Sequence, residues 1–218
     1  MKSGSLPAKA DPAKQEEFYH VTLQPLMEQA DNGDIALLFL DASHFVMGCD
    51  FLGCIYGKTR RFVKTFSGRR RFNVLGAMDY VSKKVLTVAN DSYITAPEVC
   101  DLLRNIAAEY GEKKVCLVLD NARYQKCRVV QQLAGQLHIQ LIYIPPYSPN
   151  LNLIERLWKF VKGELRSKYY DDFDLFQHKI LSIITSTDNW NKSKIERLIG
   201  RGVQLFHLLF PVSSNTLA

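Results

Sequence analysis

The sequence has no long hydrophobic run and no apolar leader, which excludes two classes of protein. No run approaches the roughly 18–20 apolar residues that a membrane-spanning helix needs. The first eighteen residues, MKSGSLPAKADPAKQEEF, are polar and lack the apolar core of a signal peptide. We therefore expect a soluble protein that acts in the cytoplasm and has no membrane partner.

Cysteine is scarce and follows no pattern, with five residues in a chain of 218. Cys49 and Cys54 form the one near pair, and neither a second pair nor close histidines accompany them. A disulfide framework or a zinc site needs a tighter pattern, so we expect reduced thiols. The chain also has no phosphate-binding glycine loop and no dinucleotide-binding fingerprint. With 12 Gly, 8 Pro and 47% hydrophobic residues, its composition is that of a packed globular domain.

Charge is present but unevenly distributed. The chain carries a net charge of +6. The segment 58–71, KTRRFVKTFSGRRR, has seven basic residues and no acid, so the rest of the chain has a net charge of −1. Phe62 and Phe66 are interleaved with these basic residues. Such a patch suits a polyanion such as DNA; a solvated basic hairpin without a partner is the alternative. The predicted DNA-binding residues of this patch are Lys58, Arg60, Arg61, Lys64, Arg69, Arg70 and Arg71.

The first half of the chain predicts a helix followed by three strands. Residues 12–31 favour a helix that breaks or bends near Pro25. The apolar run within 34–43 predicts a buried strand that ends near Asp41. Residues 72–78 and 84–89 predict two more core strands. Because no helix lies between these strands, we expect an antiparallel meander.

The second half of the chain alternates helices with strands. Thr95 and Glu98 form a capping box that opens a helix ending at Gly111. Strand–helix–strand order favours parallel neighbours joined by crossover helices, so we predict an α/β fold with a mixed five-stranded sheet flanked by helices. The remaining predicted elements are strands at 115–120 and 139–144 and helices at 124–136, 150–168, 174–187 and 192–206.

Three acidic residues occupy positions that suggest a functional role. Asp41 and Asp120 each end a run of apolar residues, and an unpaired buried carboxylate is costly. The ends of such strands are where ligand sites gather in open sheets, although an aspartate there also caps turns and helices. Glu155 lies one turn inside the predicted helix 150–168, after the proline-rich stretch PPYSP.

Glu155 heads a row of basic residues on that helix. Lys159, Lys162 and Arg166 follow it at helical spacing, on a different face from the apolar stripe that includes Trp158. A surface Glu155–Lys159 pair is the alternative reading. Three carboxylates that converge instead match the oxygen ligands of hard divalent cations, and two such ions support phosphoryl transfer.

Two sequence motifs resemble those of a known enzyme family. One is LDNARYQ, around Asp120, and the other is IPPYSPNLNLIE, which ends at Glu155. The two acids are separated by 34 residues. These motifs, with LDASHF at Asp41, resemble the DDE transposases of the IS630/Tc1/mariner superfamily, in particular the bacterial IS630 branch. The resemblance covers residues 34–170.

The resemblance implies a fold, a cofactor and a reaction. It implies an RNase H-like domain in which Asp41, Asp120 and Glu155 bind two Mg²⁺ or Mn²⁺ ions and Asn121 supports the site. Enzymes of this family cut double-stranded DNA at transposon ends and join the freed 3′-hydroxyl to target DNA, commonly at TA. The resemblance further implies a homodimer on DNA, associated with a bacterial nucleoid, with Lys159 and Lys162 as further DNA contacts.

The chain also departs from the family pattern. Gln125, Leu153 and Ala42 stand where relatives often have a histidine, a proline and an acid. None of these positions is a proposed metal ligand. Residues 1–33 are too few for the paired helix-turn-helix module of full-length relatives and resemble the linker that follows it, so a separate DNA-binding module is a possible partner. We expect a catalytic domain at 34–170 and a helical extension at 171–218 packed on it.

Three other interpretations were compared with this one. Asp41, Ser43 and His44 do not form a hydrolytic triad, because neighbouring residues of a strand point to alternate faces. An RNase H-like endonuclease without strand transfer, and a catalytically idle or domesticated DNA-binding remnant, both remain as alternatives to a transposase.

Overall fold

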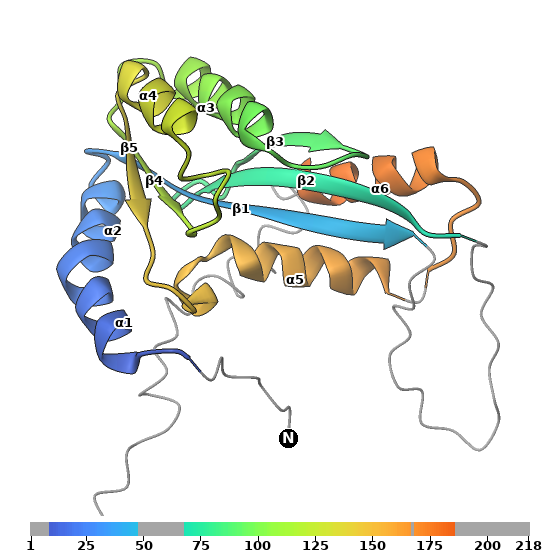
Figure 1. Cartoon of the computed structure of the whole chain (residues 1–218), viewed down its shortest axis with the longest axis horizontal. Helices are drawn as coiled ribbons and strands as arrows, with labels where there is room; N and C mark the ends of the chain where they lie inside the picture. The colour runs from blue at the N-terminus through green and yellow to red at the C-terminus, as the bar shows by residue number, and fades with distance from the viewer. Residues whose placement is uncertain (1–8, 48–67, 167, 186–218) are drawn as a thin grey trace, which may run out of the picture.

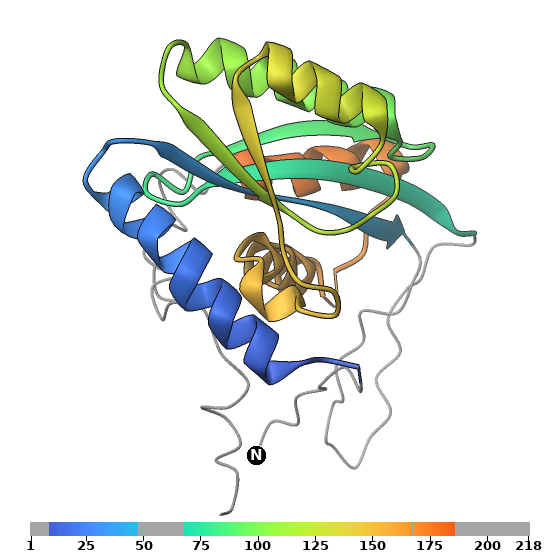
Figure 2. The same cartoon turned by 60° about the vertical axis from the view of Figure 1, so that its left-hand side comes forward.

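A five-stranded sheet forms the centre of the molecule, with helices on both faces (Figures 1 and 2). The computed structural model describes residues 9–47, 68–166 and 168–185. Its strands are β1 (Ala36–Met47), β2 (Arg70–Asp79), β3 (Val85–Asn90), β4 (Val115–Leu119) and β5 (Ile139–Tyr143). Its helices are α1 (Pro12–Phe18), α2 (Gln24–Asp31), α3 (Ala96–Tyr110), α4 (Arg128–Gln136), α5 (Ile154–Leu165) and α6 (Phe173–Thr185), with a π-helical turn, Tyr19–Leu23, and a 3₁₀ turn, Pro149–Leu151.

The sheet is antiparallel on one side and parallel on the other. Its strand order is β3-β2-β1-β4-β5. The pairs β1–β2 and β2–β3 are antiparallel, whereas β1–β4 and β4–β5 are parallel. The mixed five-stranded sheet predicted from the order of apolar segments is thereby confirmed.

Two hydrophobic layers hold the helices against the sheet. One face of the sheet packs against α3 and α4, where Leu103 and Val130 meet strand residues such as Leu38. The other face packs against α2, α5 and α6, where Trp158 and Phe176 share a cluster with strand residues of β1 and β2. Figure 1 shows α3 and α4 above the sheet and α5 beneath it. Among the described residues, no helix is long and apolar enough to cross a membrane.

Strand β1 is longer than the sequence predicted. It continues to Met47, so the prediction that the strand ends near Asp41 is wrong. Its pairing with β4 stops at Phe39, whereas its pairing with β2 continues from Leu38 to Met47. The continuous buried run ends at Leu40, next to the last residue that pairs with β4, and beyond it buried residues alternate with half-buried and exposed ones.

Two helix boundaries also differ from the prediction, whereas the N-terminal helical segment spans residues 12–31 as predicted. The N-terminal helix runs past Pro25 into α2 without a break, and a π-helical turn precedes the proline. There the N–H of Gln24 bonds to the carbonyl of Tyr19, a wider spacing that accommodates a proline with no N–H to donate. Helix α4 begins at Arg128 rather than 124, after a turn, and the predicted helix 150–168 divides into a 3₁₀ turn and α5.

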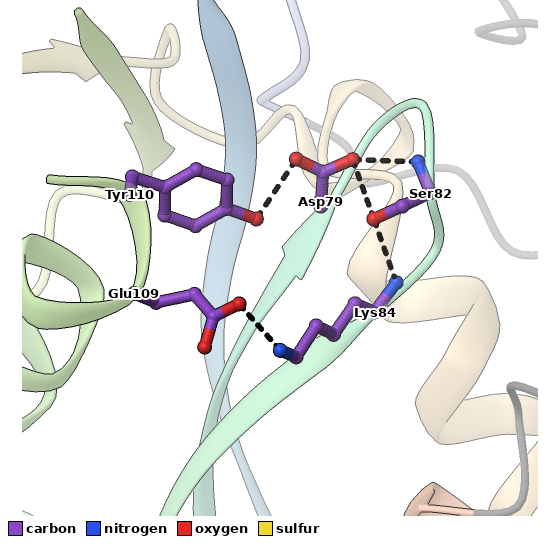
Figure 3. A network of polar contacts seen from close by, with 5 residues as sticks. All are labelled: Asp79, Ser82, Lys84, Glu109 and Tyr110. Atoms are coloured by element: carbon purple, nitrogen blue, oxygen red, sulfur yellow. Dashed lines mark hydrogen bonds and ion pairs between the residues drawn. The ribbon is translucent and has the colours of Figure 1, made fainter. Parts of the chain in front are cut away.

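A polar network fixes the β2–β3 turn to the end of α3 (Figure 3). The buried carboxylate of Asp79 accepts hydrogen bonds from the backbone N–H of Ser82 at 2.6 Å and from the hydroxyl of Tyr110 at 2.9 Å. Burial, reinforced by the charge of Asp79, raises the pKa of Tyr110 above its usual range. Beside it, Lys84 and Glu109 form an ion pair. These contacts join the antiparallel side of the sheet to its first covering helix.

Candidate active site

Three acidic side chains from three different elements line one hollow. Asp41 comes from β1, Asp120 follows β4 directly, and Glu155 lies in α5. The hollow has a volume of about 330 Å³, and the segment from Ile144 to Pro149 forms its opposite wall. Asp41 and Asp120 are half-buried, and Glu155 is exposed. The structure therefore brings together the three carboxylates that the sequence singled out.

The two aspartates lie close together because each follows the point at which the pairing of β1 with β4 ends. Phe39 of β1 pairs with Val118 of β4, which is the last pair in that register. Asp41 is two residues beyond Phe39, and Asp120 is two residues beyond Val118. A crevice outside the carboxyl ends of parallel strands is the usual ligand site of an open sheet, and both aspartates enter it from its floor.

Glu155 reaches the same hollow from the start of α5. It is the second residue of that helix, so the prediction of a position one turn inside is wrong. Its backbone N–H bonds to the carbonyl of Asn152 at 3.2 Å. The prolines of the preceding loop restrict its backbone, and Tyr147 between them adopts a left-handed conformation with φ of 59°. This constrained loop places the helix start, and with it Glu155, at the hollow.

Two hydrogen bonds hold α5 and its lead-in loop against β1 beside the acids. The indole Nε1 of Trp158 donates to Oδ2 of Asp41 at 3.1 Å. The side-chain amide of Asn152 donates to the carbonyl of Leu40 at 2.9 Å. Because Leu40 and Asp41 are adjacent, these bonds fix the strand and the helix start as one unit.

Gly76 makes the first of these bonds possible. It lies opposite Asp41 in the β1–β2 register. A Cβ atom at this position would lie 2.8 Å from Cη2 of Trp158 and 3.2 Å from Cδ1 of Ile154. The absence of a side chain on β2 therefore leaves the space in which the indole ring lies while its N–H reaches Asp41.

The second acid has its own local support. Oδ1 of Asp120 accepts the backbone N–H of Ala122 at 2.8 Å, which closes a turn directly after β4. The side chain of Asn121 donates to the carbonyl of Ile144 at 2.6 Å. That bond ties the turn after β4 to the end of β5, so Asn121 supports the wall of the hollow.

The surroundings of the hollow raise the pKa of two of its acids, Asp41 and Glu155. Burial, followed by the negative charge of Glu155, raises the pKa of Asp41 to about 7, against the lowering effect of hydrogen bonds from Ala42 and Trp158. Loss of hydration also raises the pKa of Glu155, which Asp120 reinforces and Lys162 opposes. A bound cation would offset the burial and mutual repulsion that disfavour the charged forms of Asp41 and Glu155.

The acids do not form a ready-made chelate. Among the described residues, no group of three or more His, Cys, Asp or Glu side chains is close enough to hold one metal ion. The donor chemistry nevertheless fits a hard cation, since every charged group on the floor of the hollow is a carboxylate. Mg²⁺ commonly keeps several waters and takes only one or two carboxylates directly.

The predicted basic residues occupy two places in the described structure. Lys159, Lys162 and Arg166 line an open groove of about 740 Å³ that also contains Glu155. No ion pair between Glu155 and Lys159 is found among the described residues. Arg69, Arg70 and Arg71 line a second hollow at the start of β2. Lys58, Arg60, Arg61 and Lys64 lie outside the described residues, as do Cys49, Cys54 and the predicted helix 192–206.

Sequence reasoning missed three contributors to the site. Asn152, Gly76 and the N–H of Trp158 all act through contacts between residues far apart in the sequence. Trp158 was interpreted as a packing residue, and it is indeed 2% exposed. The available signal was that a buried indole N–H needs an acceptor, but the sequence did not indicate which one.

Comparison with known proteins shows the family to which the chain belongs. The model of a family described as DDE superfamily endonuclease matches residues 36–177. An uncharacterized 39 kDa protein of insertion element IS630 from Shigella sonnei is 32% identical over 105 residues, which span 47% of this chain and 30% of that protein.

Solved structures of a transposase share the fold. The mariner Mos1 paired-end complex with Mg superposes with a TM-score of 0.62 at 15% identity, covering 92% of this chain and 64% of that one. The Mos1 transposase catalytic domain with raltegravir and Mn gives 0.55 at 12% identity, covering 91% of this chain and 98% of that one. These are RNase H-like cores, so the predicted fold class is confirmed.

Proposed function

The chain belongs to the family of DDE superfamily endonucleases, and from this premise we propose that it is the catalytic domain of a transposase of the IS630/Tc1/mariner type. The observation that carries the proposal is the single hollow lined by Asp41, Asp120 and Glu155. The proposed reaction is the hydrolysis of DNA phosphodiesters at transposon ends, followed by attack of the freed 3′-hydroxyl on target DNA.

The proposed cofactor is a pair of Mg²⁺ or Mn²⁺ ions held by Asp41, Asp120 and Glu155. When bound, such ions lower the pKa of a water nucleophile and stabilise the charge on the leaving oxygen. The fit rests on the donor set, which is made of carboxylates whose mutual repulsion and burial favour a cation. Structures of Mos1 have been solved with Mg and with Mn.

The residues of this chain position the reacting groups. The N–H of Trp158 donates to Oδ2 of Asp41, which holds that carboxylate at the hollow. Asn152 ties the loop before α5 to β1, and Asn121 ties the turn that carries Asp120 to the end of β5. Lys159 and Lys162 line the adjoining groove, where their charge suits the DNA backbone on either side of the scissile phosphate.

Strand transfer, a preference for TA and action as a homodimer on DNA rest on likeness to the family. The paired-end complex of Mos1 contains a transposon end, which supports double-stranded DNA as the partner proposed here. A separate helix-turn-helix module for end recognition, and association with a bacterial nucleoid, belong to the same proposal. The domain boundaries 1–33, 34–170 and 171–218 remain predictions.

A cleavage and joining assay tests the proposal. With Mn²⁺ and end-labelled double-stranded DNA that carries the element's terminal repeats, we expect cut products and strand-transfer products. Asp120→Asn should reduce both by at least about a hundredfold, because it removes a charge from the proposed metal site. Asp34→Asn, which changes an exposed aspartate that lines neither the acid hollow nor the basic hollows, is the control and should leave both unchanged.

The same assay separates the alternatives. Cutting without joined products would support an RNase H-like endonuclease, which the shared hollow also suits. DNA binding without either product would support an idle, domesticated remnant. Cleavage that survives Asp120→Asn would contradict the assignment of the acids.

A further inference from the structure

Three arginines and two aromatic rings form a hollow far from the acids. Arg69, Arg70 and Arg71 line it together with Tyr93 and Phe173, and its volume is about 460 Å³. It lies where β2 begins, opposite the end of β1, since Arg70 pairs with Met47. We call these five residues and the space between them the arginine hollow.

The arginine side chains are held in place by the rings. The guanidinium of Arg70 lies 4.0 Å from the centroid of Phe173, and that of Arg71 lies 5.0 Å from the centroid of Tyr93. Arg71 also donates to the carbonyl of Ser92. Because successive residues of a strand point to opposite faces, the two guanidinium groups lie on either side of the start of β2. A planar guanidinium stacked on a ring keeps its outward N–H groups free to bind phosphate.

The positive charge of the hollow is not neutralised by the described residues. No ion pair among them involves any of the three arginines, although Asp91 also lines the hollow. Arg69 and Arg70 are exposed, and Arg71 is half-buried. Three arginines around the start of β2, none of them in an ion pair with a described residue, favour a polyanion over a neutral ligand.

The open edge of β1 connects the arginine hollow with the acids. Beyond Phe39 no described strand pairs with that edge of β1. His44 lies along it, and burial followed by the positive charges of Lys162 and Arg71 lowers the pKa of His44. The charges of Lys162, in the α5 groove, and Arg71, in the arginine hollow, therefore both reach His44 of β1. From Asp41 to Met47 the strand spans about 20 Å, or roughly six base-pair steps of duplex DNA.

We propose that the arginine hollow is a second contact for the DNA backbone, and that one duplex lies along the open edge of β1 from the acid-lined hollow, past Lys162, to Arg70 and Arg71. This inference rests on DNA as the substrate and adds where the flanking duplex lies. The acids hold the scissile phosphate, and the arginines hold phosphates about six steps away.

The salt dependence of DNA binding tests this placement. Binding of a 24-base-pair duplex is measured without divalent metal, between about 50 and 300 mM salt, by fluorescence anisotropy. Each lost phosphate contact should reduce the magnitude of the slope of log K against log salt by about 0.9. The pair Arg70→Gln and Arg71→Gln should therefore reduce it by about 2. Combined with Lys159→Gln and Lys162→Gln, the reduction should approach 4, because one duplex contacts both sets.

Two matched variants guard the interpretation. Arg70→Lys with Arg71→Lys keeps the charge and should retain most of the slope, even though the stacking on Phe173 and Tyr93 changes. Lys113→Gln with Lys114→Gln removes two exposed charges next to the start of β4 and should leave the slope unchanged. An unchanged slope in the arginine-to-glutamine pair, or an equal loss in the Lys113 and Lys114 pair, would overturn the proposal. Because no metal or cleavage is involved, the result stands apart from the cutting assay.

Discussion

At the scale of single residues, Asp41 carries both a raised pKa and a hydrogen bond from a residue far away in the sequence. Its carboxylate is half-buried, faces two other acids across one hollow and receives a single side-chain donor, Trp158. Burial and the charge of Glu155 raise its pKa from 3.8 to about 7. In the metal-free protein an ionised Asp41 therefore destabilises the fold, as expected where a residue is kept for chemistry rather than stability.

This constraint predicts how stability depends on pH. Because the folded pKa of Asp41 lies above its unfolded value, its contribution to the free energy of unfolding is greatest below about pH 4 and falls as the pH rises to about 7. Asp41→Asn cannot ionise, so the free energy of unfolding of this variant does not fall with pH for that reason. In EDTA the variant should gain about 2 kcal/mol relative to the parent chain between pH 5 and pH 8, as measured by urea unfolding. A difference between the two proteins that does not change with pH would contradict the assignment.

At the scale of elements, α5 does two tasks at once. Its buried face, with Leu157 and Val161, belongs to the hydrophobic core. Its first turn carries Glu155, and its second supplies the indole that binds Asp41. Packing and chemistry are therefore coupled through the contact between Trp158 and Gly76.

A double-mutant cycle measures that coupling. Gly76→Ala should destabilise the protein by about 1–3 kcal/mol, because its Cβ forces the Trp158 ring out of place. Trp158→Phe loses the N–H donor but leaves a smaller ring. In the combined variant the Phe ring leaves room for the new methyl group, so the loss in free energy of unfolding should be smaller than the sum of the single losses.

Gly135→Ala serves as the control for this cycle. Gly135 lies in α4, where an added Cβ meets nothing within 4 Å. Alanine there should stabilise the helix by up to about 1 kcal/mol. Additive losses at Gly76 and Trp158 would show that the two residues do not share the space.

At the scale of the whole molecule, the N-terminal helix is joined to the wall of the site. Gln15 of α1 is 1% exposed, and its Oε1 accepts a hydrogen bond from Asn150 at 3.0 Å. Asn150 lies in the 3₁₀ turn that leads to α5, and Lys9 lies over the ring of Tyr147 in the same loop. Figures 1 and 2 show the N-terminal helix next to the start of α5, with its axis crossing that of α5. Segments about 135 residues apart thus meet next to the acids.

Removal of this contact should affect both stability and activity. Gln15→Ala takes away a buried acceptor and should lower the free energy of unfolding by about 1–2 kcal/mol, as measured by thermal and urea unfolding. We also expect slower DNA cleavage at temperatures well below the transition, because the loop before Glu155 loses a support. Glu17→Ala changes an exposed residue of the same helix and should alter neither. Equal effects of the two substitutions would assign the change to helix propensity alone.

The sequence was a good guide to the strands and to the identity of the acids. Runs such as that at 115–119 are apolar because both faces of the sheet are covered by helices, and such a run can be recognised in the sequence alone. The extension of β1 to Met47 could not be predicted, because it depends on pairing with β2 beyond the point where pairing with β4 ends. For the same reason Gly76 and Asn152 gave no signal, since their roles depend on which distant residue lies opposite each.

The strand order has a consequence for how the chain acquires its fold during synthesis. A ribosome delivers β1, β2 and β3 in succession, and they can pair as a meander at once. The other edge of β1 must then wait for β4, although β1 ends as the central strand of the sheet. Until then an apolar strand presents unpaired backbone groups, the usual starting point for intermolecular association. Catalytic competence comes later still, because Glu155 is made after both aspartates, so an unfinished chain carries no complete set of acids.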